Sequence, residues 1–120
     1  MRLRKIVADT RYQGIPQYIQ MIFEKPIVPR RISITFQGGF VGTRTALEIP
    51  ISGGSGGGKT EWKEWSSIFP EDVNRAQTFD LSHKDGAEGG VQGLKLVFQE
   101  SSDFFGRITV YDLQLDGDIL

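Results

Sequence analysis

The stretch Ser101–Gly117 reads SSDFFGRITVYDLQLDG and decides the fold of this 120-residue chain. Its second half, Arg107–Asp116, alternates apolar and polar residues, which is typical of a half-buried β-strand. Its first half, Asp103–Arg107, predicts a turn that sets two phenylalanines and an arginine at the entrance to that strand. We therefore expect the central strand of a β-sandwich, preceded by a turn at the rim of the sandwich.

Other short segments carry a similar two-residue period. The clearest is Arg31–Gln37 (RISITFQ), in which Ile32, Ile34 and Phe36 share one face. Pro26 and Pro29 exclude a helix before it and predict a connection there. Further strands are predicted at Gln17–Phe23, Thr43–Ile51, Gln77–Leu81 and Gly93–Gln99.

The segment Glu61–Phe69 is ambiguous, because its two tryptophans have helical spacing and a bulged strand fits equally well. The chain shows six or seven short strand patterns, regular turn signals and no convincing long helix. This combination predicts an all-β fold, an antiparallel β-sandwich of the jelly-roll kind, with residues 1–120 as a single domain.

Composition excludes several classes of protein. The chain is 38% hydrophobic and 24% charged, as in soluble globular proteins, and it has no cysteine for a disulfide or a thiolate site. No apolar run reaches the length of a membrane span, so we expect no membrane partner. The basic start lacks the apolar core of a signal peptide, and together with the lack of cysteine this favours an intracellular location. Residues 1–31 hold seven basic and two acidic residues, but only Tyr12 is interleaved with the basic ones, so we do not expect a nucleic-acid partner.

The sharpest motif is Gly53–Thr60 (GGSGGGKT), which fits the phosphate-binding pattern G-x-x-x-x-G-K-[ST]. That loop binds phosphate only between a parallel strand and the N-terminus of a helix. The segment from Thr60 to Pro70 is too short for a firm helix, and the strands alternate as antiparallel strands do. Nucleotide binding therefore remains a remote alternative, and Ser52–Gly58 is expected to be a flexible loop.

Catalytic and metal-binding patterns are weak elsewhere. The one histidine, His83, lies in a polar loop segment, and without cysteine a zinc site is improbable. The acidic residues near the end of the chain have no common focus. We expect no enzyme activity, no cofactor and no metal.

The order of these segments resembles the discoidin-type, galactose-binding-like β-sandwich. The residues that carry the resemblance are QYIQMIF, ISITFQGG, a loop before Trp62 and Trp65, GLKLVF, and the final strand ITVYDLQLDG, with Asp112-Leu113 where that family has Glu-Leu. FQGGF (Phe36–Phe40), FPED (Phe69–Asp72) and DFFGR (Asp103–Arg107) resemble, within it, the small nuclear-receptor-associated proteins, repressors that partner an orphan testicular receptor. Members of the discoidin-type family carry more residues before the first of these strands than this chain does. Either the fold is trimmed at one edge, which would leave an unpaired sheet edge, or the chain is a shortened product.

The resemblance implies a non-catalytic protein-interaction module, an adaptor or regulatory protein of the cytoplasm or nucleus. Its partner would be another protein, such as a nuclear receptor or a larger assembly. The candidate contact residues lie in two rim loops: Gln37, Phe40, Asp103, Phe104, Phe105 and Arg107. The alternative for the last loop is a structural one, with Phe105 closing the end of the core and Arg107 paired to Asp103.

A second function is carbohydrate binding, the commoner use of the galactose-binding-like fold. A sugar site needs an aromatic platform, and Trp62 or Trp65 could supply one. Since a fold alone decides neither activity, the choice depends on the site.

Overall fold

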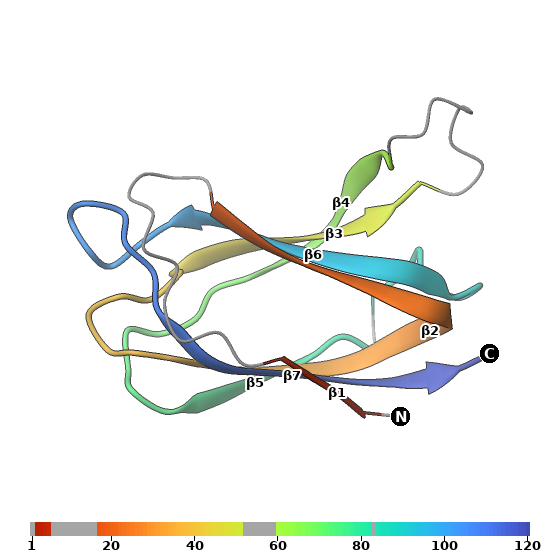
Figure 1. Ribbon diagram of the computed structural model, residues 1–120, viewed down its shortest axis with the longest axis horizontal. Helices are drawn as coiled ribbons and strands as arrows, with labels where there is room; N and C mark the ends of the chain where they lie inside the picture. The colour runs from red at the N-terminus through yellow and green to blue at the C-terminus, as the bar shows by residue number, and fades with distance from the viewer. Residues whose placement is uncertain (1, 6–16, 52–59, 83) are drawn as a thin grey trace.

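The computed structural model describes residues 2–5, 17–51, 60–82 and 84–120, so the predicted loop Ser52–Gly58 and His83 lie outside the described residues (Figure 1). The described residues form seven strands. None of these residues belongs to a helix long and apolar enough to cross a bilayer. The strands are β1 (Arg2–Lys5), β2 (Gln17–Phe36), β3 (Arg44–Pro50), β4 (Trp62–Ile68), β5 (Ala76–Asp80), β6 (Val91–Glu100) and β7 (Val110–Ile119).

The strands form one sheet that curls onto itself into two layers (Figure 1). The strand order is β1-β7-β2-β6-β3-β4, β5 pairs with β2, and every pairing of these strands is antiparallel. Strand β2 joins the layers, because its first part pairs with β6 and its second part pairs with β7 and β5. The predicted all-β antiparallel sandwich is confirmed.

The predicted connection at Pro26 and Pro29 is wrong, because β2 runs through both prolines. Proline lacks the N–H that a sheet ladder needs and is tolerated at irregularities. Pro26 lies between Ile22 and Ile27, where the pairing with β6 shifts register. Pro29 lies next to a second register shift, in the pairing with β7. Both prolines thus stand where the ladder is interrupted, and the strand bends between the layers instead of ending.

Strand β4 settles the ambiguity of the tryptophan segment. It pairs with β3 and carries a register shift opposite Leu47 and Glu48, so the bulged strand is correct. The chain beyond Thr60 therefore enters an antiparallel strand and not a helix. A phosphate loop at Gly53–Thr60 would lack the helix N-terminus on which its chemistry depends, so the remote nucleotide alternative is not supported.

One hydrophobic core fills the space between the layers. Phe36 of β2 and Phe98 of β6 are fully buried and meet edge to face, with ring centroids 5.9 Å apart. Each such ring contributes about 1.5–3 kcal/mol of transfer free energy on burial. The other fully buried large side chains include Ile32, Ile34, Leu47, Leu94, Leu96, Ile108, Leu113 and Leu115.

Strand β1 tests the expectation that the sheet has an unpaired edge near the start of the chain. β1 pairs with β7 over four residues, from Arg2 opposite Asp116 to Lys5 opposite Leu113. The edge of β7 that faces away from β2 is therefore occupied along this stretch.

Candidate functional site

Three loops meet at one end of the sandwich, where β2, β4 and β6 end (Figure 1). We define the rim as residues 37–44, 69–75 and 99–107. Ser102 joins two of these segments, since its N–H donates to the Val41 carbonyl and its hydroxyl oxygen accepts from the Val41 N–H, both at 2.9 Å. The Thr109 N–H donates to the Phe40 carbonyl at 3.0 Å. The loops thus hold one another in place.

The third rim segment supports the glycine turn of the first. The Asn74 Oδ1 accepts from the Gly38 N–H at 2.9 Å, and the Asp72 Oδ1 accepts from the Gly39 N–H at 2.8 Å. Gly39 has a φ of 90°, a left-handed conformation that other residues rarely adopt. The turn before Phe40 is therefore set by its glycines and by two neighbouring polar side chains.

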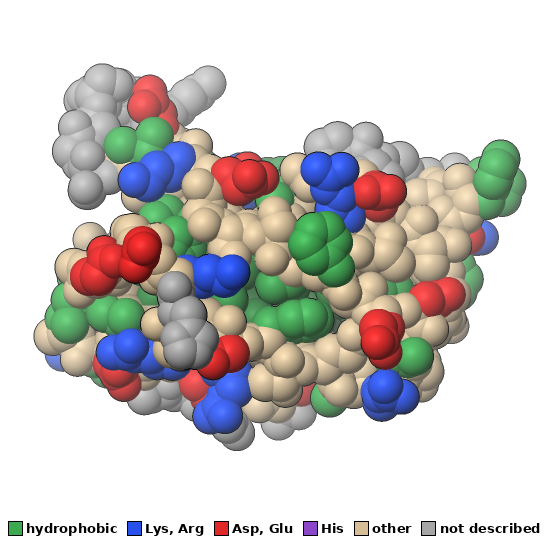
Figure 2. Space-filling view, turned by 180° about the vertical axis from the view of Figure 1, so that it is seen from behind, with side chains coloured by type: hydrophobic (Ala, Val, Ile, Leu, Met, Phe, Trp, Pro, Cys, Tyr) green, Lys and Arg blue, Asp and Glu red, His purple; other side chains and the backbone are tan. Residues whose placement is uncertain are grey.

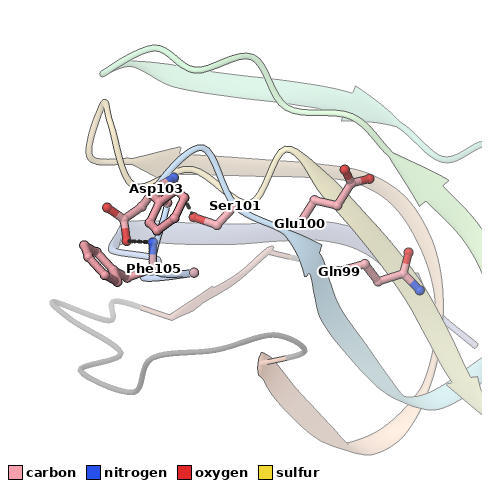
Figure 3. Close-up of a pocket in the computed structure, with 7 residues that line it drawn as sticks. Gln99, Glu100, Ser101, Asp103 and Phe105 are labelled. Atoms are coloured by element: carbon pink, nitrogen blue, oxygen red, sulfur yellow. Dashed lines mark hydrogen bonds between the residues drawn. The ribbon is translucent and has the colours of Figure 1, made fainter.

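Asp103 organises the second loop. Its carboxylate accepts four hydrogen bonds, from the backbone N–H groups of Phe105 (3.1 Å) and Arg107 (3.0 Å) and from two nitrogens of the Arg107 guanidinium (2.9 and 3.0 Å). The Ser101 hydroxyl accepts from the Asp103 N–H at 3.0 Å (Figure 3). It also donates to the Arg107 carbonyl at 2.7 Å. Hydrogen bonds from Asp103 and from Ser101 therefore hold the turn in one conformation.

The electrostatics of this turn match its geometry. The side-chain hydrogen bond from Arg107 lowers the pKa of Asp103 to about 2, against the smaller opposing effect of partial burial. The same bond raises the pKa of Arg107 above its ordinary value. Both groups therefore stay charged through the neutral pH range. Two parallel hydrogen bonds between a guanidinium and a carboxylate form the strongest kind of side-chain ion pair.

Gly106 completes the turn. Its φ is 75°, and its N–H donates to the Asp103 carbonyl at 3.0 Å. The Gly106 carbonyl accepts from the side-chain amide of Gln17 at 2.7 Å. The start of β2 is thus joined to the tip of the rim.

The two phenylalanines of the turn point outward. Phe104 is 93% exposed and Phe105 is 57% exposed, and their rings meet edge to face at 5.2 Å. The alternative in which Phe105 closes the core is therefore wrong, although the expected pairing of Arg107 with Asp103 is present. The Arg107 guanidinium also lies over the rings of Phe40 (5.2 Å) and Phe105 (5.5 Å).

An open hollow of about 390 Å³ lies beside these rings, and Figure 3 shows the residues that line it. The end of β6 supplies one side, and the turn supplies the other. The lining residues are Gln99–Ser101 and Asp103–Gly106.

The remaining predicted residue of the rim, Gln37, acts through its backbone. Its N–H donates to the Thr109 carbonyl, and its own carbonyl accepts from the Phe40 N–H, both at 3.0 Å. The structure thus brings Phe40, Phe105, Asp103 and Arg107 together and leaves Gln37 at the base of the neighbouring turn.

The two tryptophans of β4 do not form one platform. Trp65 packs against the core, and its indole N–H donates to the Asp85 carbonyl at 2.8 Å. Trp62 lies on the outer face of the sheet, where the Lys95 ammonium is 5.3 Å from its ring and 4.5 Å from the ring of Tyr18. Each indole is engaged within the chain.

Sequence reasoning missed the side chains that position the rim. Their signal was present, since serine, aspartate and asparagine bond to nearby backbone in turns, and they cluster in SSD at 101–103 and in EDVN at 71–74. The residues concerned are Gln17, Asp72, Asn74, Ser101 and Ser102.

Comparison with known proteins gives the family. No protein-family model matches the chain. The chain is 34% identical over 106 residues to the nuclear receptor 2C2-associated protein of Mus musculus, covering 88% of this chain and 68% of that one. It is 36% identical over 107 residues to the Danio rerio protein and 35% over 106 residues to the Homo sapiens protein of the same name, with the same coverage. The chain therefore belongs to the nuclear receptor 2C2-associated protein family.

Proposed function

We propose that this chain is a non-catalytic protein-interaction module, an adaptor or regulatory protein of the cytoplasm or nucleus, and that it docks its partner through the rim. One observation carries the proposal: a phenylalanine ring that is 93% exposed stands on a turn held by six hydrogen bonds around Asp103 and Ser101. An exposed ring contributes little to the stability of the isolated domain. Because the turn that carries it is already fixed, a partner could bury the ring without the entropic cost of ordering the loop.

The composition of the rim supports this use. Aromatic residues and arginine are enriched among the residues that dominate binding energy at protein interfaces. Here Phe104, Phe105 and Arg107 lie within one turn, and Phe40 lies beneath the arginine. Burial of one phenylalanine side chain by a partner contributes about 1.5–3 kcal/mol.

The proposed partner follows from the relatives. Their name describes them as associated with nuclear receptor 2C2. We propose that this chain binds a receptor of that kind, alone or within a larger assembly. The absence of cysteine and the single histidine in the sequence support a role without catalysis.

A binding titration with purified nuclear receptor 2C2 tests the proposal. Phe104→Ala should weaken binding by about 10-fold or more, because a buried aromatic contact is lost. Ile22→Ala is the matched control, since Ile22 is also exposed (64%) but lies on β2 outside the rim. Equal binding by both variants and the unchanged chain would refute the rim as the docking surface.

A glycan array distinguishes the carbohydrate alternative. A sugar would need an open aromatic face, but Trp65 is packed on the core and Lys95 lies over Trp62. We expect no saccharide to bind at micromolar concentration. Binding that is lost in Trp62→Ala would favour the carbohydrate function instead.

A further inference from the structure

The charged groups of the rim are arranged in pairs. Its three arginines each have a carboxylate within the rim: Arg107 with Asp103 at 2.9 Å, Arg75 with Glu71 at 3.5 Å, and Arg44 with Glu100 at 3.6 Å. The fourth carboxylate of the rim, Asp72, accepts a hydrogen bond from the Gly39 N–H. The rim therefore presents no arginine without a neighbouring carboxylate among its described residues.

The Asp103–Arg107 pair is the least available for a partner. A phosphate or carboxylate could engage Arg107 only by taking its guanidinium from Asp103. That exchange would leave a carboxylate that is 10% exposed without its cation and would undo the turn that carries Phe104. The other two pairs are exposed, but the carboxylates beside them cancel their attraction for an anion at a distance.

The wider surface gives the same picture. On the face shown in Figure 2, acidic and basic side chains are interspersed and do not gather into a patch of one sign. A nucleic acid or a strongly charged peptide needs such a patch for its affinity. What the rim leaves free is apolar: three phenylalanines that are exposed by 93%, 66% and 57%, namely Phe104, Phe69 and Phe105.

We infer that the rim binds an uncharged apolar segment of a partner protein, with an aliphatic or aromatic side chain seated in the hollow between Phe104 and the end of β6. This inference rests on the proposed function and adds the chemistry of the partner. The Phe104–Phe105 pair supplies the apolar part of the lining that such a side chain would contact. Gln99 and Glu100 also line the hollow, and their side chains offer methylene groups and polar ends to a neighbouring backbone.

The salt dependence of binding tests the inference. Using nuclear receptor 2C2 as the probe, we expect the dissociation constant to change by less than about 3-fold between about 50 and 500 mM NaCl, because screening acts on charges and not on apolar contacts. Arg44→Gln, which removes one of the exposed rim arginines, should also change affinity by less than about 3-fold. Affinity that falls more than about 10-fold over this salt range would overturn the apolar assignment. The proposed function would still stand if Phe104→Ala also lost binding.

A peptide selection provides a readout that does not depend on the receptor. Random peptides displayed on phage are selected on the full chain and counter-selected on Phe104→Ala. We expect the selected peptides to be rich in aliphatic and aromatic residues and to carry no excess of either charge. A consensus rich in acidic or basic residues would overturn it, and so would a selection from which no peptide dependent on Phe104 emerges.

Discussion

The contrast between Phe104→Ala and Phe98→Ala tests whether the exposed rim ring contributes to folding. Phe104 has 93% of its surface in water, so its removal forfeits about a tenth of the 1.5–3 kcal/mol that a fully buried side chain supplies. Its edge-to-face contact with Phe105 adds at most about 1 kcal/mol at so exposed a site. We expect the free energy of unfolding to fall by less than about 1 kcal/mol.

Phe98 is the opposite case. Its side chain is 0% exposed and packs against Phe36 in the core between the two layers. Its truncation leaves a cavity and should cost about 3–5 kcal/mol. For a domain of this size that corresponds to a fall in Tm of more than about 10 °C.

Urea unfolding followed by tryptophan fluorescence measures both variants. Trp62 and Trp65 lie on β4, so the signal reports on the sheet without an added label. A loss of more than about 2 kcal/mol in Phe104→Ala would mean that the ring supports the fold. That result would refute the argument that Phe104 is exposed for a partner.

Three further predictions follow from particular contacts. Asp103→Asn should lower the urea midpoint at pH 7, because the depressed pKa of Asp103, about 2, means that its charge stabilises the fold above about pH 4. The difference between the two chains should shrink as pH falls below 4 and vanish once pH has fallen through about 2. Gly117→Ala should lower the free energy of unfolding by about 1–3 kcal/mol and hence the Tm, since its Cβ would lie 2.6 Å from a side-chain carbon and 2.8 Å from a backbone oxygen of β2. An unchanged Tm would contradict the tight β2–β7 contact. Trp65→Phe removes the hydrogen bond to the Asp85 carbonyl and should cost about 1 kcal/mol in urea unfolding; no loss would show that this bond contributes nothing.

The strands with one buried face could be predicted from sequence because their pattern is local. Arg31–Gln37 and Gly93–Gln99 both alternate cleanly. The first coincides with the end of β2 up to Phe36, and the second lies within β6. The final strand was predicted from Arg107, whereas β7 begins at Val110. The residues just before β7 pair with a rim loop instead of a strand, since both the N–H and the carbonyl of Thr109 form hydrogen bonds to the loop at residues 37–44.

Other features depend on pairing, which a single segment does not contain. Pro26 indicated a break because its position at a register shift is a property of β2 and β6 together. The helical spacing of Trp62 and Trp65 arises at a bulged strand, where the two-residue period is interrupted. The exposure of Phe105 could not be predicted either, because it depends on how the rim loops are arranged in space.

A nuclear magnetic resonance titration of the isotopically labelled chain with nuclear receptor 2C2 tests the central claim most directly. We predict that the largest changes in backbone amide shifts fall on Gly38–Phe40 and Phe104–Arg107, the two turns that carry the aromatic side chains of the rim. Changes centred on β4 and on Tyr18, with the rim unaffected, would contradict the account and place the docking surface on the outer face of the sheet.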